Sequence, residues 1–411
     1  MGVLGARCRQ TVRMATPFTD DEIEQIRATT PGCQTDQIHL GHAGSSLPDQ
    51  RVLDVQIAHL RREAEIGGYG AAAEAADQVE AVDASLARLV GGERCDIARV
   101  EHATAGWNAA FWSIPMRSGQ RILTHQHDYG ANLVAFLRAK EVYGVDIEVV
   151  PSDRFGQIDL VALEEALAEP SEVSLVSLAW VPTSGGLVNP AAGVGALTRA
   201  ADVPFLLDAC QAVGQLTVDV EAIGCDFLAA TGRKFLRGPR GTGFLWVHPG
   251  MYDRCTVSQP DHHGFEWTLE GGATPKPGAV RYEYWESSVA GWLGLGAAVD
   301  VALELGVDRI QATIAQRATD LRRRLTDTGL TVHDQGIAKA GIVTCTHPKA
   351  SPDELRAGLA ARGISSTTTH DTSALLDHAA QGVDAMLRLS VHCTTTTAEL
   401  EAAVDALGSL T

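Results

Sequence analysis

The sequence lacks the features of a metal-binding, secreted, membrane or nucleic-acid-binding protein. Its eight cysteines contain no C-x-x-C pair, so neither a zinc site nor a disulfide framework is indicated, and we expect reduced thiols in a cytoplasmic protein. No apolar run approaches the roughly 20 residues that a membrane helix requires. The net charge of −18 would be repelled by nucleic acid and by anionic membranes. A small-molecule partner is therefore favoured.

The N-terminal residues also lack a secretory signal. They carry Arg7, Arg9 and Arg13, but no apolar segment follows these arginines. We expect residues 1–13 to be a disordered extension, with Met14 as an alternative start. Internal repeats and low-complexity stretches are absent as well. What remains is a chain of 411 residues, 45% hydrophobic and 20% charged, which is long enough for a large core and for two domains.

Between residues 121 and 248 the chain alternates short apolar runs with helical patterns. The apolar runs are 121–124, 147–150, 175–178, 205–207, 225–229 and 243–247, and the helix candidates include 160–168 and 191–201. This alternation predicts an α/β fold with a mostly parallel sheet and helices on both faces. Ligands of such sheets bind at the carboxyl ends of strands, which is where Asp208 falls.

The pattern changes after Pro275 and Pro277. A long amphipathic helix candidate leads into an apolar run and two shorter helix candidates, at 307–326, 341–345, 352–362 and 397–407. We interpret this part as a smaller α+β domain at the C-terminus. The predicted division is an N-terminal extension and arm over 1–37, a large domain over 38–287 and a small domain over 288–411.

The most informative residues are Lys234 and Asp208. Lys234 lies in a glycine-rich segment, 231–243, and Asp208 ends the apolar run 203–208. A lysine that forms a Schiff base with pyridoxal phosphate (PLP) needs a rigid setting from which it can swing between cofactor and substrate, and a carboxylate at a strand end can keep the pyridine nitrogen protonated. Each residue alone has a plainer interpretation, Lys234 as a surface lysine and Asp208 as a helix N-cap. The two residues together favour a PLP enzyme.

Several further motifs support this interpretation. Residues 208–211 read D-A-C-Q, residues 231–234 read T-G-R-K, and residues 102–108 read H-A-T-A-G-W-N at the start of a predicted helix. Residues 127–132 read H-D-Y-G-A-N, and residues 388–390 read R-L-S. With these motifs the chain, over roughly 38–407, resembles the class V aminotransferases of PLP fold type I. This group contains cysteine desulfurases, isopenicillin-type epimerases and cysteine-conjugate lyases.

The resemblance implies a set of cofactor contacts. Asp208 is expected on the pyridine nitrogen and Gln211 on the ring hydroxyl. Arg233, where the family usually has histidine, can hold phosphate. The other expected contacts are Thr231, Thr104 and Ala105 near the phosphate, Tyr129 stacked on the ring, and Thr183 near the substrate or ring oxygen.

Plainer interpretations exist for two of these segments. A helix N-cap alone would explain 102–108, because helix N-termini favour such residues whether or not an anion binds. His125 and His127 have the spacing of a metal pair, but no third ligand is evident nearby, so we expect no metal site.

The resemblance also implies a substrate site and a homodimer. Arg388 is expected to clamp the substrate carboxylate with two hydrogen bonds, although a surface salt bridge is the plainer alternative. Tyr69, Trp285 and Glu286 lie in segments that combine aromatic, acidic and glycine residues, a mixture suited to a polar or cationic substrate side chain. Loop packing would explain them equally well. The segment 281–288 is expected near the dimer interface, where it departs from the common G-T-P pattern.

The reaction is suggested by a missing residue. A cysteine desulfurase of this family needs a nucleophilic cysteine in the loop before the carboxylate arginine, and none lies between Gly363 and Arg388; Cys393 follows the arginine. The R-K pair with W-E-S resembles the epimerase-like branch, which includes lyases of cysteine conjugates. We therefore predict β-elimination from an S-substituted L-cysteine or its sulfoxide, with Lys234 as the general base. An epimerase or aminotransferase is the alternative, and a non-catalytic regulator is least favoured.

Overall fold

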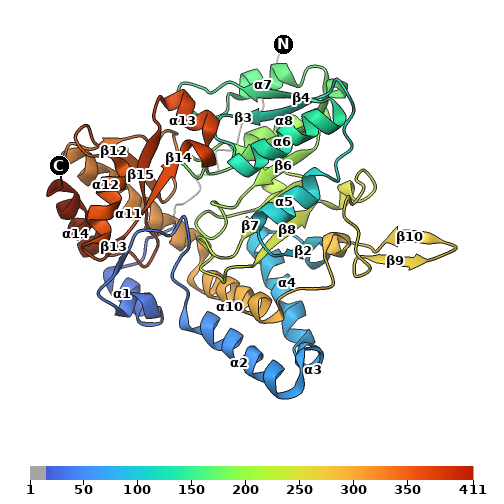
Figure 1. Ribbon diagram of the computed structural model, residues 1–411, viewed down its shortest axis with the longest axis horizontal. Coiled ribbons are helices and arrows are strands. Elements are labelled where there is room, and N and C mark those ends of the chain that lie inside the picture. Colours follow the sequence, from blue (N-terminus) through green and yellow to red (C-terminus); the bar gives the residue numbers. More distant parts are fainter. Residues whose placement is uncertain (1–14, 411) are drawn as a thin grey trace, which may run out of the picture.

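The computed structural model describes residues 15–410, so the expected extension over 1–13 and Met14 lie outside the described residues. A seven-stranded sheet forms its centre, with strand order β2-β8-β7-β6-β5-β3-β4 (Figure 1). The strands are β2 (Ile97–Val100), β3 (Arg121–His125), β4 (Asp146–Val150), β5 (Val173–Ala179), β6 (Phe205–Asp208), β7 (Phe227–Thr231) and β8 (Gly243–Val247). Strands β7, β6, β5, β3 and β4 are parallel, and only β8 runs antiparallel to its neighbours. The predicted mostly parallel sheet is confirmed.

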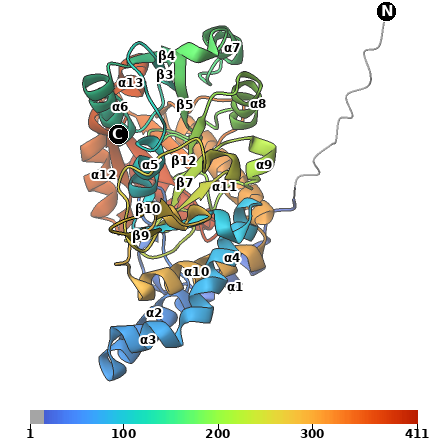
Figure 2. The ribbon, with the colours of Figure 1, turned by 90° about the vertical axis from the view of Figure 1, so that its right-hand side faces the viewer.

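Helices cover both faces of this sheet, because alternate residues of each strand enter two different cores. Leu206 packs with residues of α5 (Ala103–Phe111) and α6 (Gly130–Tyr143). Its neighbour Leu207 packs with residues of α4 (Ala76–Val90), α7 (Leu160–Ala166), α8 (Ala191–Ala201) and α10 (Val289–Leu305). Figure 2 shows α6 and α8 on opposite sides of the strands. Burial on both faces explains why these strands are continuous apolar runs.

A smaller antiparallel sheet lies near the C-terminus, with strand order β11-β12-β15-β14. Its strands are β11 (Thr331–Val332), β12 (Ile342–Thr346), β14 (Thr367–His370) and β15 (Ala385–Ser390). The helices of this part are α11 (Val307–Asp327), α12 (Pro352–Ala360), α13 (Leu375–Gln381) and α14 (Thr397–Gly408). Both α11 and α12 pack against this sheet, and α14 packs against both helices. The predicted smaller α+β part is confirmed.

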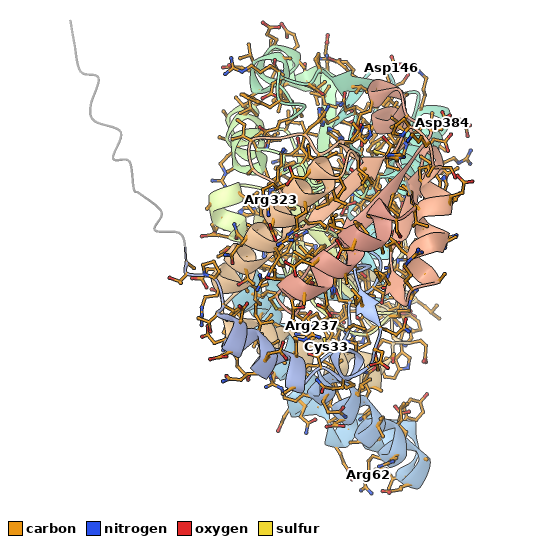
Figure 3. All side chains as sticks on the ribbon, turned by 90° about the vertical axis from the view of Figure 1, so that its left-hand side faces the viewer. Cys33, Arg62, Asp146, Arg237, Arg323 and Asp384 are labelled. Carbon is orange, nitrogen blue, oxygen red and sulfur yellow. The ribbon has the colours of Figure 1, made fainter. Side chains whose placement is uncertain are left out.

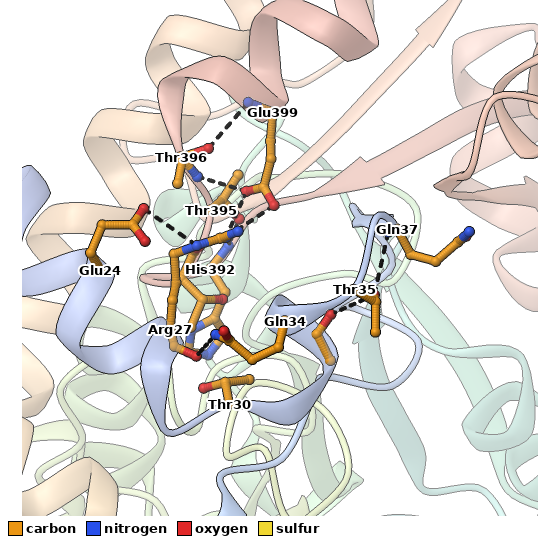
Figure 4. Close-up of polar contacts among 12 residues, drawn as sticks. Glu24, Arg27, Thr30, Gln34, Thr35, Gln37, His392, Thr395, Thr396 and Glu399 are labelled. Carbon is orange, nitrogen blue, oxygen red and sulfur yellow. Dashed lines mark hydrogen bonds and ion pairs between the residues drawn. The ribbon is translucent and has the colours of Figure 1, made fainter.

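The N-terminal segment packs against this smaller part. Strand β1 (Ile38–His39) pairs in parallel with β13 (Ile364–Ser365). Arg27, in α1 (Asp20–Ala28), forms an ion pair of 3.0 Å with Glu399 and donates to the carbonyl oxygen of Thr394 at 2.7 Å (Figure 4). The predicted domain boundaries after residues 37 and 287 stay predictions.

Two elements project from the body. The helices α2 (Gln50–Ile66) and α3 (Gly68–Glu74) form an arm, on which Figure 3 labels Arg62. The hairpin of β9 (Phe265–Thr268) and β10 (Gly272–Pro275) projects from another side of the body, on the right in Figure 1. A short helix, α9 (Val220–Ile223), precedes β7. Among residues 15–410, no single helix has the length and apolar composition to cross a membrane; only α10 and α11 together, bent by 81°, meet both criteria.

Candidate functional site

A cavity of about 270 Å³ opens at the carboxyl ends of β5, β6 and β7. Eight of the residues that the sequence predicted for the site line this one cavity: Thr104, Tyr129, Thr183, Asp208, Gln211, Thr231, Arg233 and Lys234. They come from segments far apart in the chain, and the parallel strands bring them together because all of these strands end at the same edge.

Asp208 lies at the end of β6 and is buried. Its Oδ1 accepts a hydrogen bond from the amide of Cys210 at 2.9 Å, and its Oδ2 accepts one from Asn132 Nδ2 at 3.1 Å. These two donors hold the carboxylate in one orientation at the cavity wall. A fixed carboxylate of this kind can pair with a protonated ring nitrogen.

A second buried carboxylate, Asp128, stands behind Asp208. The same Nδ2 of Asn132 donates to Asp128 Oδ1 at 2.8 Å, and Thr124 donates to Asp128 Oδ2 at 2.6 Å. Burial raises the pKa of Asp128 to about 6, and the charge of Asp208 adds to the shift against these hydrogen bonds. Asn132 therefore joins two acids that would otherwise repel each other in a medium of low dielectric constant.

Gln211 carries an unused acceptor. Its Nε2 donates to the carbonyl oxygen of Ala43 at 3.1 Å and to Thr183 Oγ1 at 3.4 Å. Its Oε1 is buried and has no hydrogen-bond partner among residues 15–410. Because a buried acceptor without a partner is costly, this oxygen calls for a donor from a ligand. The ring hydroxyl of PLP is such a donor, so the residues present fit the expected cofactor.

The cationic residues follow β7. Lys234 is buried and Arg233 donates a hydrogen bond to the carbonyl oxygen of Gly44. Nearby, α5 begins with His102 as its N-cap, whose Nδ1 accepts from the amide of Ala105 at 3.1 Å. Thr104 lines the cavity, whereas Ala105 does not. The amide of Ala105 already donates to the His102 N-cap. A helix N-terminus beside a guanidinium provides a binding place for a phosphate group.

Arg388 lies just beyond this cavity, in β15. Its Nη1 donates to both the carbonyl oxygen and Oγ1 of Thr183 at 2.8 Å, and its Nε donates to Thr367 Oγ1 at 3.0 Å. Burial lowers the pKa of Arg388 to about 10, and the charge of Arg233 adds to this shift. Arg388 forms no ion pair with any carboxylate in the described part of the chain, so a surface salt bridge does not describe it. Arg388 is half-buried, and its role as the carboxylate-binding residue stays a prediction.

Three predicted substrate residues do not line this cavity. Tyr69 lies on the projecting α3 with 84% of its surface exposed, and Trp285 is 55% exposed. Glu286 lines a smaller neighbouring cavity of about 30 Å³, which shares Gly241 with the first. Within one subunit the structure therefore does not bring Tyr69 and Trp285 to the site, and their roles stay predictions.

The cavity also contains residues to which the sequence assigned no role. They include Asn132, Cys210, His102, Trp107 and Arg240. Cys210 is the third residue of the D-A-C-Q motif, between the predicted cofactor residues Asp208 and Gln211. This position is the sequence signal that could have placed Cys210 at the site. Burial raises the pKa of the Cys210 thiol, with the cation of Lys234 opposing this shift.

The histidine pair at 125 and 127 has other partners. The two rings lie 4.9 Å apart, and His125 Nε2 contacts Ser152 Oγ at 2.9 Å. His127 pairs with Asp377 at 2.9 Å. No group of three or more histidine, cysteine or acidic side chains suited to a metal ion occurs within residues 15–410.

Comparisons with known proteins agree with this geometry. The family model described as "Aminotransferase class-V" matches residues 38–403. A probable cysteine desulfurase of Xylella fastidiosa is 28% identical, with 96% of each chain covered. A probable hercynylcysteine sulfoxide lyase of Mycobacterium tuberculosis is also 28% identical, with 96% of this chain and 95% of the relative covered. Identity alone therefore does not separate the two activities.

Solved structures share the fold. A cysteine desulfurase from Thermococcus onnurineus NA1 superimposes with a TM-score of 0.87 at 20% identity, covering 94% of this chain and 97% of the other. A cystine C–S lyase in complex with its reaction product cysteine persulfide gives a TM-score of 0.82 at 20% identity, covering 92% and 99%. The arrangement of the two sheets is thus the one found in these proteins.

Proposed function

The chain belongs to the aminotransferase class-V family and is a PLP-dependent enzyme, and from this premise we propose that it cleaves a carbon–sulfur bond by β-elimination. The proposed substrate is an S-substituted L-cysteine or its sulfoxide. Elimination gives a thiol or sulfenate and aminoacrylate, and water then hydrolyses the released aminoacrylate to pyruvate and ammonia. The expected family, cofactor and PLP fold type I are confirmed; the substrate and the outcome at Cβ are the proposal.

One observation carries the choice of elimination over desulfuration. A desulfurase must receive sulfur on a cysteine, and the small-domain segment between Gly363 and Arg388 contains none. Cys393 is fully buried, and its Sγ lies 3.1 Å from His392 Nδ1. Of the cysteines in the described residues, only Cys210 lines the cavity. Elimination needs no sulfur acceptor, because the sulfur leaves with its substituent.

The proposed roles are those of the cofactor contacts and of two groups that act on the substrate. Asp208 and Gln211 hold the ring nitrogen and the ring hydroxyl, and Tyr129 covers one ring face. Bound PLP supplies an electron sink for charge that develops at the substrate's Cα. The proposed phosphate contacts are Arg233, Thr231, Thr104 and the start of α5.

The two remaining groups act on the substrate. Arg388 binds the α-carboxylate, which fixes the orientation of the Cα–H bond. Lys234 would take the proton from Cα as the general base. The departure of the sulfur substituent from Cβ then needs only a proton donor, a role that Lys234 fills after it has taken up the Cα proton.

We also infer a cytoplasmic homodimer. The seven cysteines within residues 15–410 are all free, which suits a reducing compartment. The projecting α2 and α3 expose Leu60, Ile66 and Tyr69, and exposed apolar residues of this kind mark interfaces. In a dimer, this arm and the segment 281–288 are the parts proposed to complete the partner's substrate site. Sedimentation of the purified protein tests the dimer.

Product analysis tests the reaction. With an S-conjugated L-cysteine or its sulfoxide, pyruvate should form in step with substrate loss. The variants Cys393→Ser and Cys210→Ser should both still form pyruvate, since neither thiol receives sulfur. Accumulation of alanine, together with loss of activity in either variant, would establish desulfuration instead. Inversion at Cα without release of sulfur would establish the epimerase alternative, and transfer of the amino group to a keto acid would establish the aminotransferase.

A further inference from the structure

We propose that Asp377 is a positioning residue that fastens the small domain onto two walls of the cavity. Asp377 lies on α13 and is 1% exposed. It contacts His127 and Ser184, which belong to two separate loops of the large domain. The kinetic part of this proposal rests on the proposed function, whereas the structural part does not.

The contacts of Asp377 account for both of its oxygens. Oδ1 lies 2.9 Å from His127 Nδ1 and accepts a hydrogen bond from Gln381 Nε2 at 2.8 Å. Oδ2 accepts a hydrogen bond from Ser184 Oγ. His127 is itself held on its far side, where Nε2 lies 3.0 Å from the carbonyl oxygen of Gly156. The contact with His127 is close, but it is not an aligned hydrogen bond.

Each of the two partners stands beside a residue that lines the cavity. His127 precedes Tyr129 by two residues, and Ser184 directly follows Thr183. Thr183 also receives the guanidinium of Arg388. A shift of α13 would therefore move the proposed ring-stacking residue and the proposed carboxylate site at the same time.

A close backbone contact, which involves no charge, also joins the start of α6 to the segment before α13. Gly130 begins α6, next to Tyr129. A Cβ atom at Gly130 would lie 2.7 Å from the carbonyl oxygen of Thr372, in the turn that precedes α13. Only glycine permits this approach, so the backbone of the small domain is seated directly on the start of α6.

The loop that contains Thr183, Ser184 and Gly186 is hydrogen-bonded to the small domain at each of these residues. Gly186 donates its amide to Asp334 Oδ1 at 3.2 Å, and its carbonyl oxygen accepts from the amide of Ala340 at 2.6 Å. Asp334 is held in turn by Arg322 at 2.7 Å. With Arg388 on Thr183 and Asp377 on Ser184, each of these loop residues has a small-domain partner.

The electrostatics favour a charged carboxylate at this place. Burial opposes the ionisation of Asp377, but His127 and Ser184 outweigh it and hold the pKa of the carboxyl below its usual value. Removing the charge leaves the buried imidazole of His127 without its carboxylate partner. The substitution Asp377→Asn keeps the shape of the side chain and an oxygen for Ser184, so it removes mainly the pairing with His127.

Hydrogen exchange of the cofactor-free protein is the first test. In Asp377→Asn we expect amide exchange to accelerate in two segments, 127–133 and 183–187, and to stay unchanged in β6 and β7. The matched control is Asp384→Asn, the same substitution at an exposed residue of the same domain, which Figure 3 labels at the edge of the molecule. Exchange that is unchanged, or that accelerates equally over the whole chain, would overturn the proposal.

Steady-state kinetics is the second test. Asp377→Asn should raise the KM of the substrate about tenfold while kcat changes less than about threefold, because the substrate site shifts and the cofactor contacts of Asp208 stay. His127→Gln combined with Asp377→Asn should be no worse than either single variant. A loss confined to kcat, or additive effects, would contradict a shared contact.

Ser184→Ala provides an independent variant if Asp377→Asn does not fold. It should accelerate exchange in 183–187 only, leaving 127–133 as in the wild type. Acceleration in neither segment would overturn the proposal. If no conjugate yields pyruvate, the proposed function fails, while the exchange experiments still decide the role of Asp377.

Discussion

Asn132 Nδ2 donates a hydrogen bond to Asp208 Oδ2 at 3.1 Å. The same nitrogen donates to Asp128 Oδ1 at 2.8 Å, so one amide group links two buried carboxylates. This donor gives one oxygen of each carboxylate a hydrogen bond from the same side chain. The orientation of this cavity-lining carboxylate thus depends on a residue of α6, not only on the end of its own strand.

We expect Asn132→Asp to weaken PLP binding at least about tenfold, because it replaces the shared donor with a third acceptor between two acids. Asn132→Ala should have a smaller effect, since it leaves Asp208 with the amide of Cys210. Titration of the cofactor-free variants with PLP measures both affinities. Equal affinities in the wild type and Asn132→Asp would show that the link does not matter for the cofactor.

Lys234 should be the residue that carries the cofactor. The chain has five lysines, and of these only Lys234 lines the cavity. Borohydride reduction followed by peptide mapping should place the phosphopyridoxyl group on Lys234, and Lys234→Ala should lose pyruvate formation. A label on any other lysine would refute the assignment.

Asp208→Asn should retain some cofactor but lose most turnover. A neutral amide does not hold the pyridine nitrogen protonated, so the ring becomes a poorer electron sink. Cofactor content by absorbance and pyruvate formation are measured on the same sample. Full turnover in this variant would mean that Asp208 has a different partner.

Arg388→Lys should lower kcat/KM about tenfold to hundredfold, mainly through KM. Losing a charge-assisted hydrogen bond costs about 1.5 to 3 kcal/mol, and lysine does not reproduce the planar fork. PLP affinity should change less than KM, because Arg388 donates its hydrogen bonds to Thr183 and Thr367 and not to Asp208 or Gln211. An unchanged KM would show that another group holds the carboxylate.

The pH dependence of stability should reveal the Asp377 pair. Since the pKa of Asp377 is lowered in the folded protein, its ionised form stabilises the fold above the unfolded-state pKa of about 4. That stabilisation is lost as the pH falls through the lower, folded-state value. The Tm of the wild type should therefore exceed that of Asp377→Asn at pH 6, and the difference should shrink below pH 4. Calorimetry across this range checks the sign.

Much of the large domain was predictable from the sequence. The helix expected over 191–201 is α8, and the run that ends in Asp208 is β6. These predictions succeed because buried parallel strands need continuous apolar residues, and because ligand-binding residues follow strand ends. The D-A-C-Q and T-G-R-K motifs have the same local character, since each lies within a few residues of its strand.

The sequence by itself determined the alternation of strands and helices, and with it the cavity residues that follow β6 and β7. Only the tertiary structure decided which distant groups meet: Arg388 with Thr183, Asp377 with His127, and Asn132 with Asp208. Local patterns arise from hydrophobic periodicity over a few residues and are readable in the chain. Contacts between side chains 76 to 250 positions apart follow from how helices, strands and loops from distant parts of the chain pack, and no short-range pattern records them.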